Sequence, residues 1–128
     1  MKILVETAPG ELIDKITILE LKLENISDGA KLANVRREYH ALIDAYHSAI
    51  VETVELRELK AKLKEINAAI WRIEDDIRGQ ERARTFDEAF VALARSVYQT
   101  NDRRAAIKRE INELLNSKIV EEKSYTSY

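Results

Sequence analysis

The sequence contains no cysteine, only one proline and only three glycines among its 128 residues. Without cysteine the chain has no disulfides, thiolate zinc sites or cysteine nucleophiles, which is compatible with a reducing compartment. So few glycines and prolines suit helices better than a sheet with many turns. The apolar start of the segment 1–6 is too short for a signal peptide, and no apolar run approaches the roughly 18 residues of a membrane span. We therefore expect a soluble, cytoplasmic protein with no membrane partner.

Neither sign of charge dominates the chain. Charged residues make up 34% of the sequence, yet the net charge is only −2. This balance does not favour nucleic acid as a partner. A small basic patch lacks the interleaved aromatic residues of a nucleic-acid surface; it comprises Arg103, Arg104, Lys108 and Arg109. A chain of 128 residues fits a single domain spanning residues 1–128.

The longest regular pattern lies between Ala30 and Arg78, which contains no glycine or proline. Apolar residues there alternate at spacings of 3 and 4, as one buried helical seam requires; they are Leu56, Leu59, Leu63, Ile66, Ile70, Ile73 and Ile77. The register slips in the segment 50–54, where four of the five residues are β-branched. We predict a break there and helices of about 30–50 and 54–82. The alternative is one continuous helix about 75 Å long.

Two further helices complete the predicted fold. The first runs from Pro9 to about Ile26 and carries apolar residues on two faces, so it is either central or a subunit contact. The last runs to about Leu115 after a capping box that begins at Thr85. The segments 3–5 and 118–125 are either a strand pair or loose ends. The prediction is an all-α antiparallel bundle, or coiled-coil-like hairpin, of about four helices, with the terminal strand pair as an option.

The last helix contains a conflict between charge and burial. Asn101, Arg104 and Lys108 project from its apolar stripe if the helix is unbroken. Cations on a core-facing stripe are unfavourable unless they are paired or hydrogen-bonded. Three explanations remain: a new helix capped at residues 100–101 turns both cations toward water, an internal ion-pair network compensates them, or an anionic ligand binds them.

Acidic residues form the natural counter-charge. If the long helix ends near Gly79, the carboxylates of residues 74–76 crowd its negative end and need cations or a metal. If the helix continues toward Arg84, Glu74 and Arg78 form an ordinary i,i+4 pair. Two other sets have metal-ligand spacing, namely His40, Asp44 and His47, and Glu20 and Glu24 together with Glu74 or Asp75. Such side chains on charged helices are usually solvated, so we expect no metal and no cofactor.

Four polar segments, in this order, are fairly specific: residues 10–20, 73–78, 93–108 and 121–125. With them the chain resembles a family of short bacterial and phage proteins classed as a domain of unknown function, over nearly its whole length. The resemblance implies no established activity, although relatives can accompany genes for cell-surface glycan assembly. It implies one shared polar site, with candidates Lys15, Glu74, Asp75, Arg95, Tyr98, Asn101, Asp102, Arg104 and Lys108.

The leading functional hypothesis is a helical protein–protein interaction module without recognisable catalytic chemistry. We expect it to form a homodimer through the first helix, at Ile18 and Leu21, or through the long seam. The alternative is a site for a small phosphate- or carboxylate-bearing ligand, built from Lys15, Arg95, Tyr98, Arg104 and Lys108. A weaker alternative is a metal-assisted, all-helical nucleotide hydrolase, which needs paired carboxylates on two helices. No catalytic residue is assigned.

Overall fold

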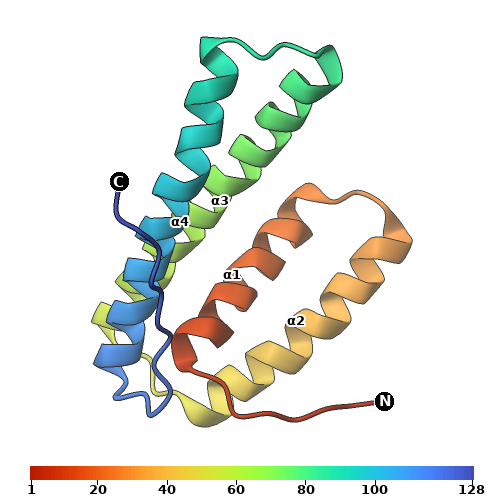
Figure 1. Cartoon of the computed structure of the whole chain (residues 1–128). Helices are drawn as coiled ribbons and strands as arrows, with labels where there is room; N and C mark the ends of the chain where they lie inside the picture. Colours follow the sequence, from red (N-terminus) through yellow and green to blue (C-terminus); the bar gives the residue numbers. More distant parts are fainter.

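The computed structural model describes all residues, 1–128, and contains four helices and no strand (Figure 1). The helices are α1 (Pro9–Asn25), α2 (Gly29–Ala49), α3 (Val54–Ala83) and α4 (Glu88–Leu114). The all-α prediction is confirmed. The break in the long apolar pattern is also confirmed, since residues 50–53 separate α2 from α3, and the alternative of one continuous helix is wrong.

Local side-chain chemistry explains where most of the helices begin. Pro9 occupies the first position of α1, where its missing N–H is not needed. The Asp28 carboxylate accepts from the N–H groups of Ala30 and Lys31 at 2.9 and 3.0 Å and so starts α2. The Thr53 hydroxyl caps α3 in the same way through the Leu56 N–H. The β-branched segment before α3 therefore ends one helix and caps the next.

The connection between α3 and α4 agrees with the predicted end of the long helix, near residue 82, and differs from the predicted start of the last one. Helix α3 continues through Gly79 to Ala83, and Arg84 closes it in the left-handed conformation with φ 54°. The carboxylates of residues 74–76 consequently do not crowd a helix end. Asp87 caps α4, accepting from the Ala89 and Phe90 N–H groups, so the capping box predicted to begin at Thr85 does not form. An aspartate next to the helix start accepts these bonds more directly than a threonine two residues earlier.

The helices form two antiparallel hairpins, α1–α2 and α3–α4, as Figure 1 shows. Helix α1 is central because its backbone packs against α2, α3 and α4, whereas the backbone of α2 packs closely only against α1. Helix α3 reaches α2 through a side chain, since the Lys60 ammonium lies 5.0 Å from the centre of the Tyr46 ring. The second apolar face of α1 is covered within the chain: Leu21 is buried and Ile18 is half-buried, and both line a groove with α3. The central position predicted for this helix is therefore correct.

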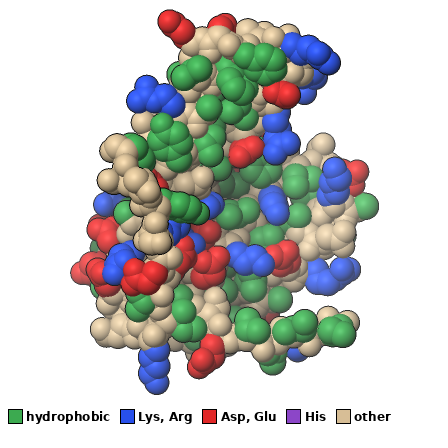
Figure 2. All heavy atoms as spheres, viewed as in Figure 1, with side chains coloured by type: hydrophobic (Ala, Val, Ile, Leu, Met, Phe, Trp, Pro, Cys, Tyr) green, Lys and Arg blue, Asp and Glu red, His purple; other side chains and the backbone are tan.

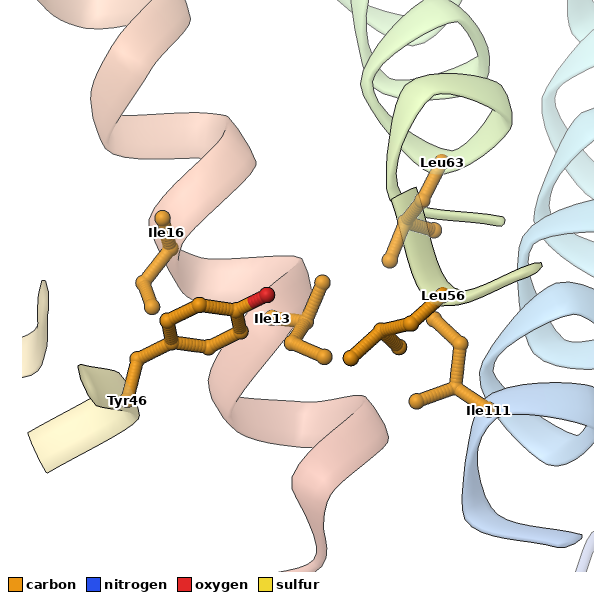
Figure 3. Close-up of a cluster of buried hydrophobic side chains, with 6 residues drawn as sticks. All are labelled: Ile13, Ile16, Tyr46, Leu56, Leu63 and Ile111. Carbon is orange, nitrogen blue, oxygen red and sulfur yellow. The ribbon is translucent and has the colours of Figure 1, made fainter. Parts of the chain in front are cut away.

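The hydrophobic core is small and lies where the two hairpins meet (Figure 3). Its buried side chains come from all four helices: Ile13, Ile16, Tyr46, Leu56, Leu63 and Ile111. The Tyr46 ring is buried while its hydroxyl donates to the Glu52 carboxylate at 2.8 Å; burial and this acceptor raise the pKa of Tyr46. Burial of the ring therefore leaves no polar group unsatisfied.

The α3–α4 hairpin extends beyond this core as residues 68–99, which we call the outer arm. No residue of the outer arm is buried, although the apolar seam continues through it. The whole chain exposes 9174 Å². A compact monomer of its mass would expose about 6,900 Å². The outer arm, the extended N-terminal residues 1–7, the outer face of α2 and the C-terminal residues 118–128 all contribute to this exposed area.

The two chain ends form no strand pair. Residues 1–7 lead away from the start of α1 and are fully exposed, whereas the C-terminal residues 118–128, the tail, run along α4 (Figure 1). Polar contacts between the tail and α4 replace the ladder that a strand pair would supply. None of the four helices has both the length and the apolar character needed to cross a membrane.

Candidate functional site

Polar side chains are buried where α1, α3 and α4 face one another. Buried polar groups destabilise a protein unless they are hydrogen-bonded or paired, so each of them should have a partner. The six side chains are Asp14, Thr17, Asn67, Thr100, Lys108 and Asn112. Five of them form two clusters, one around Asn67 and one around Lys108, whereas the Thr100 hydroxyl accepts a long hydrogen bond, 3.5 Å, from Arg103.

Asn67 is the centre of the first cluster. Its amide nitrogen donates to the Asp14 carboxylate at 2.8 Å and to the Thr17 hydroxyl at 3.0 Å. Thr17 in turn donates to the backbone carbonyl of Asp14 at 2.8 Å. These contacts use both donors of the amide, so its oxygen must point away from α1. That oxygen accepts a long hydrogen bond, 3.5 Å, from the Arg104 guanidinium.

Arg104 therefore lies at the edge of the buried cluster rather than in bulk water. Its side chain is half-buried and forms no ion pair with any carboxylate of the chain. Helix α4 is continuous through Thr100 and Asn101, which excludes the prediction of a new helix capped there. The prediction that Arg104 lies on the core-facing side of the last helix is correct.

Lys108 is the centre of the second cluster. Its ammonium lies 2.8 Å from the Glu11 carboxylate and 3.0 Å from that of Glu121 in the tail. Burial of the ammonium works against its charge, but the hydrogen bonds to Glu11 and Glu121 outweigh it and raise the pKa of Lys108. The hydrogen bond from Lys108 lowers the pKa of Glu121. For Lys108, the internal ion-pair explanation is correct.

Gly10 brings the start of α1 against α4 in this second cluster. Its backbone N–H donates to the Asn112 side-chain oxygen at 2.7 Å. A Cβ atom at this position would lie 2.6 Å from the Lys108 carbonyl oxygen, which is backbone and cannot move aside easily. Only glycine permits this approach. The contact fixes the first turn of α1, and with it Glu11, beside Lys108.

The nine residues predicted to share one site are divided among several places. Lys15 pairs with Glu38 of α2 at 3.2 Å, and Glu74 pairs with Arg78 at 3.3 Å. Arg95 is exposed on the outer arm, without an ion pair. Asn101 is half-buried on α4. The others meet the tail or line the groove described below.

The tail brings Tyr98 and Asp102 together. The Tyr128 hydroxyl donates to the Asp102 carboxylate at 2.8 Å, and the Tyr128 ring lies edge-on to the Tyr98 ring at 5.0 Å between centroids. Together with the Lys108–Glu121 pair, these contacts hold the tail along α4. Figure 2 shows acidic and basic side chains gathered over the part of the molecule where the tail crosses α4.

Three of the predicted residues, Glu74, Asp75 and Arg104, do line one groove, which we call the α1/α3 groove. It has a volume of about 240 Å³ and borders the Asn67 cluster, since Asn67 is part of its lining. Its lining comes from α1, α3 and α4: Ile18, Leu21, Lys22, Asn67, Ile70, Trp71, Glu74, Asp75 and Arg104. Lys108 lies outside it, in a separate hollow beneath the tail.

Sequence reasoning missed several residues of the two buried clusters. Asp14, Thr17, Asn67 and Asn112 each look like ordinary polar positions of an amphipathic helix. One signal for Asn67 was available, because it lies beside the heptad residues Ile66 and Ile70 and is therefore close to the seam.

No group of three histidine, aspartate or glutamate side chains lies close enough together to hold a metal ion. His40, Asp44 and His47 are exposed on α2. Glu20 and Glu24 do not converge with Glu74 or Asp75; Glu24 instead binds Lys64. Neither set with metal-ligand spacing is therefore assembled by the fold.

Comparison with known proteins adds one finding. A family model described as a family of unknown function (DUF6165) matches residues 1–128. Among curated proteins and solved structures, none matches the chain.

Proposed function

The chain belongs to this family of unknown function, DUF6165, and we propose that it is a helical assembly module that forms a homodimer through its outer arm. The observation that carries the proposal is the absence of any buried residue between Asn67 and Thr100. Two helices that pack along one apolar seam cover only part of each other, so such a hairpin needs a further layer.

The outer arm has the apolar residues that such a layer would cover. Its seam side chains are half-buried; they are Ile70, Ile73, Ile77, Phe90, Leu93 and Val97. Phe86 and Val91 are more than half exposed, at 57% and 53%. Figure 2 shows hydrophobic side chains gathered on the surface of this part of the molecule. Contiguous apolar surface of this kind is typical of an interaction site.

A second copy of the chain fits this surface for two reasons. The exposed area of the whole chain exceeds that of a compact monomer by roughly one-third, and the outer arm, which has no buried residue, contributes to this excess. The outer arm carries five basic and six acidic residues, so charge repulsion does not oppose self-association. Two hairpins related by a two-fold axis would form a four-helix bundle in which the heptad seam is a coiled-coil-like core.

The proposal is tested by the mass of the protein in solution. Sedimentation velocity should show a dimer for the wild-type chain at micromolar concentration. The double substitution Phe86→Lys and Val91→Lys should give a monomer with unchanged helix content by circular dichroism, because both side chains are exposed.

Val54→Lys is the matched control for this experiment. Val54 is 58% exposed, close to the 53% of Val91, but lies at the start of α3 outside the outer arm. This variant should remain a dimer. A monomeric wild-type chain at high concentration, or equal dissociation of the control, would contradict the proposal.

A further inference from the structure

The α1/α3 groove is lined by side chains of both signs of charge that form no ion pair with one another. Lys22 and Arg104 are its cations, and Glu74 and Asp75 are its carboxylates. No ion pair joins any two of these four side chains, and only Glu74 has a partner, Arg78, which lies outside the groove lining. A groove lined by both signs of charge, with no ion pair between them, is suited to a ligand that carries both signs itself.

Arg104 is the best-positioned of these groups. Its guanidinium has five N–H donors, and the chain uses one of them, at 3.5 Å, to Asn67. Asp14 and Thr17 hold the Asn67 amide nitrogen, and this fixes the position of the amide oxygen that contacts the Arg104 guanidinium. A half-buried planar fork with free donors is suited to bidentate binding of a carboxylate.

The rest of the lining limits the kind of ligand. Glu74 and Asp75 would repel a nucleotide or another polyanion and would attract an ammonium group. The walls also contain apolar surface from Ile18, Leu21, Ile70 and the Trp71 ring. The volume of about 240 Å³ is below the range of roughly 300–1,000 Å³ that holds drug-sized ligands. The ligand is therefore small.

We propose that the α1/α3 groove binds a small zwitterion, a free α-amino acid with an apolar side chain. Its carboxylate binds Arg104, its ammonium lies beside Glu74 and Asp75, and its side chain packs against Trp71. Ile70, Trp71, Glu74 and Asp75 belong to the outer arm, but the whole groove lining comes from one chain, so the site does not require the proposed dimer.

The single tryptophan of the sequence, Trp71, lines the groove and gives a local optical signal. Tryptophan emission is recorded during titration with leucine, with N-acetylleucine, which lacks the ammonium, and with leucinamide, which lacks the carboxylate. Leucine should give a saturable change. Both blocked analogues should bind at least about tenfold more weakly, because each loses a charge-assisted contact. Equal responses to the three compounds, or no response to leucine, would overturn the proposal.

Substitutions then assign the two ends of the ligand. Arg104→Gln should weaken leucine binding about tenfold or more, whereas Arg95→Gln, which removes an exposed arginine of the same helix, should not. Arg104→Gln also alters the Asn67 cluster, so a second test is needed that leaves this cluster intact. The double variant Glu74→Gln and Asp75→Asn provides it, because Glu74 is only half-buried and Asp75 is exposed. It should remove the preference for leucine over N-acetylleucine, and an unchanged preference would contradict the assignment.

The double variant Phe86→Lys and Val91→Lys separates this site from the dimer. Leucine should bind it as it binds the wild-type chain, since neither residue lines the groove. Loss of leucine binding in this variant would show that the site requires the dimer, contrary to a site formed within one chain.

Discussion

The Lys108 ammonium lies 2.8 Å from the Glu11 carboxylate and so joins α4 to the first turn of α1. The two ends of this pair are unequally buried: the Lys108 side chain is 10% exposed and that of Glu11 is 46% exposed. Glu121, the second partner, is 41% exposed. Removal of the cation and removal of its partners should therefore have different consequences.

We predict that Lys108→Met destabilises the fold by only about 1 kcal/mol, because the thioether fills much of the volume of the stem and the freed carboxylates face water. The double variant Glu11→Gln and Glu121→Gln should cost about 3 kcal/mol, since it leaves a buried ammonium without a counter-charge. Urea unfolding followed by circular dichroism measures both. A larger loss for Lys108→Met than for the double variant would contradict the ion-pair account.

The same cluster makes the docking of the tail depend on pH. Lys108 lowers the pKa of Glu121 below its ordinary 4.5, so this contact stabilises the docked tail above that pH and is lost as the pH falls through the lowered value. The pKa of Lys108 is raised above 10.5, so its contribution is present below that pH and is lost as the pH rises through the raised value. The tail should remain docked between about pH 5 and pH 10.

Amide chemical shifts of residues 118–128 measure this docking across the pH range. In the wild-type chain their acid transition should have a midpoint below 4.5, the ordinary value for Glu121. In Lys108→Met the midpoint should move up toward the ordinary value, because the hydrogen bond from Lys108 is the main cause of the lowered pKa of Glu121. A wild-type midpoint at or above the ordinary value would show that Lys108 does not hold the tail.

Helix positions could be predicted well because they depend on local patterns. The register slip near Thr53 and the absence of glycine and proline between residues 30 and 78 can be read from adjacent residues of the sequence. The incomplete burial of the seam side chains in the outer arm could not be predicted in this way. Burial of Ile73 depends on whether another layer covers it, and a periodic pattern specifies an apolar face but not its partner.

The candidate site likewise contains one feature that the sequence predicts and others that it does not. The conflict at Lys108 was predictable, since a charge on an apolar stripe is visible in the sequence. Its partner Glu11 was not, because an acidic residue in a first helical turn is favourable in any helix. Asn67 and Asp14 are 53 residues apart, and nothing local to either indicates that they meet.

Two glycines in helices should respond oppositely to alanine. At Gly79 the nearest atom to an added Cβ is the end of the Arg82 side chain at 3.9 Å, so Gly79→Ala should stabilise the chain by about 1 kcal/mol through helix propensity. At Gly10 the added Cβ would lie 2.6 Å from the Lys108 carbonyl and 2.8 Å from the Asn112 oxygen. Gly10→Ala should therefore destabilise the chain by about 2 kcal/mol or more, despite the same gain in propensity.

Thermal unfolding of the two alanine variants compares them directly, each serving as the control for the other. The melting temperature should rise for Gly79→Ala and fall for Gly10→Ala. A rise for both would mean that α1 and α4 can separate at Gly10 without loss of stability. It would also remove the reason for placing Glu11 firmly beside Lys108.

The free-energy losses caused by substituting Asn67 and Asp14 should not add in a double-mutant cycle, because the two side chains share one hydrogen bond. Asn67→Leu leaves the Asp14 carboxylate, in a residue only 5% exposed, without its donor, and should cost about 3 kcal/mol. Asp14→Leu alone leaves the Asn67 amide short of an acceptor and should cost about 2 kcal/mol. In the double variant two leucines meet across α1 and α3, so the total loss should be smaller than that of Asn67→Leu alone. Urea unfolding of the four proteins gives the coupling energy, and strictly additive losses would show that the two side chains are stabilised independently.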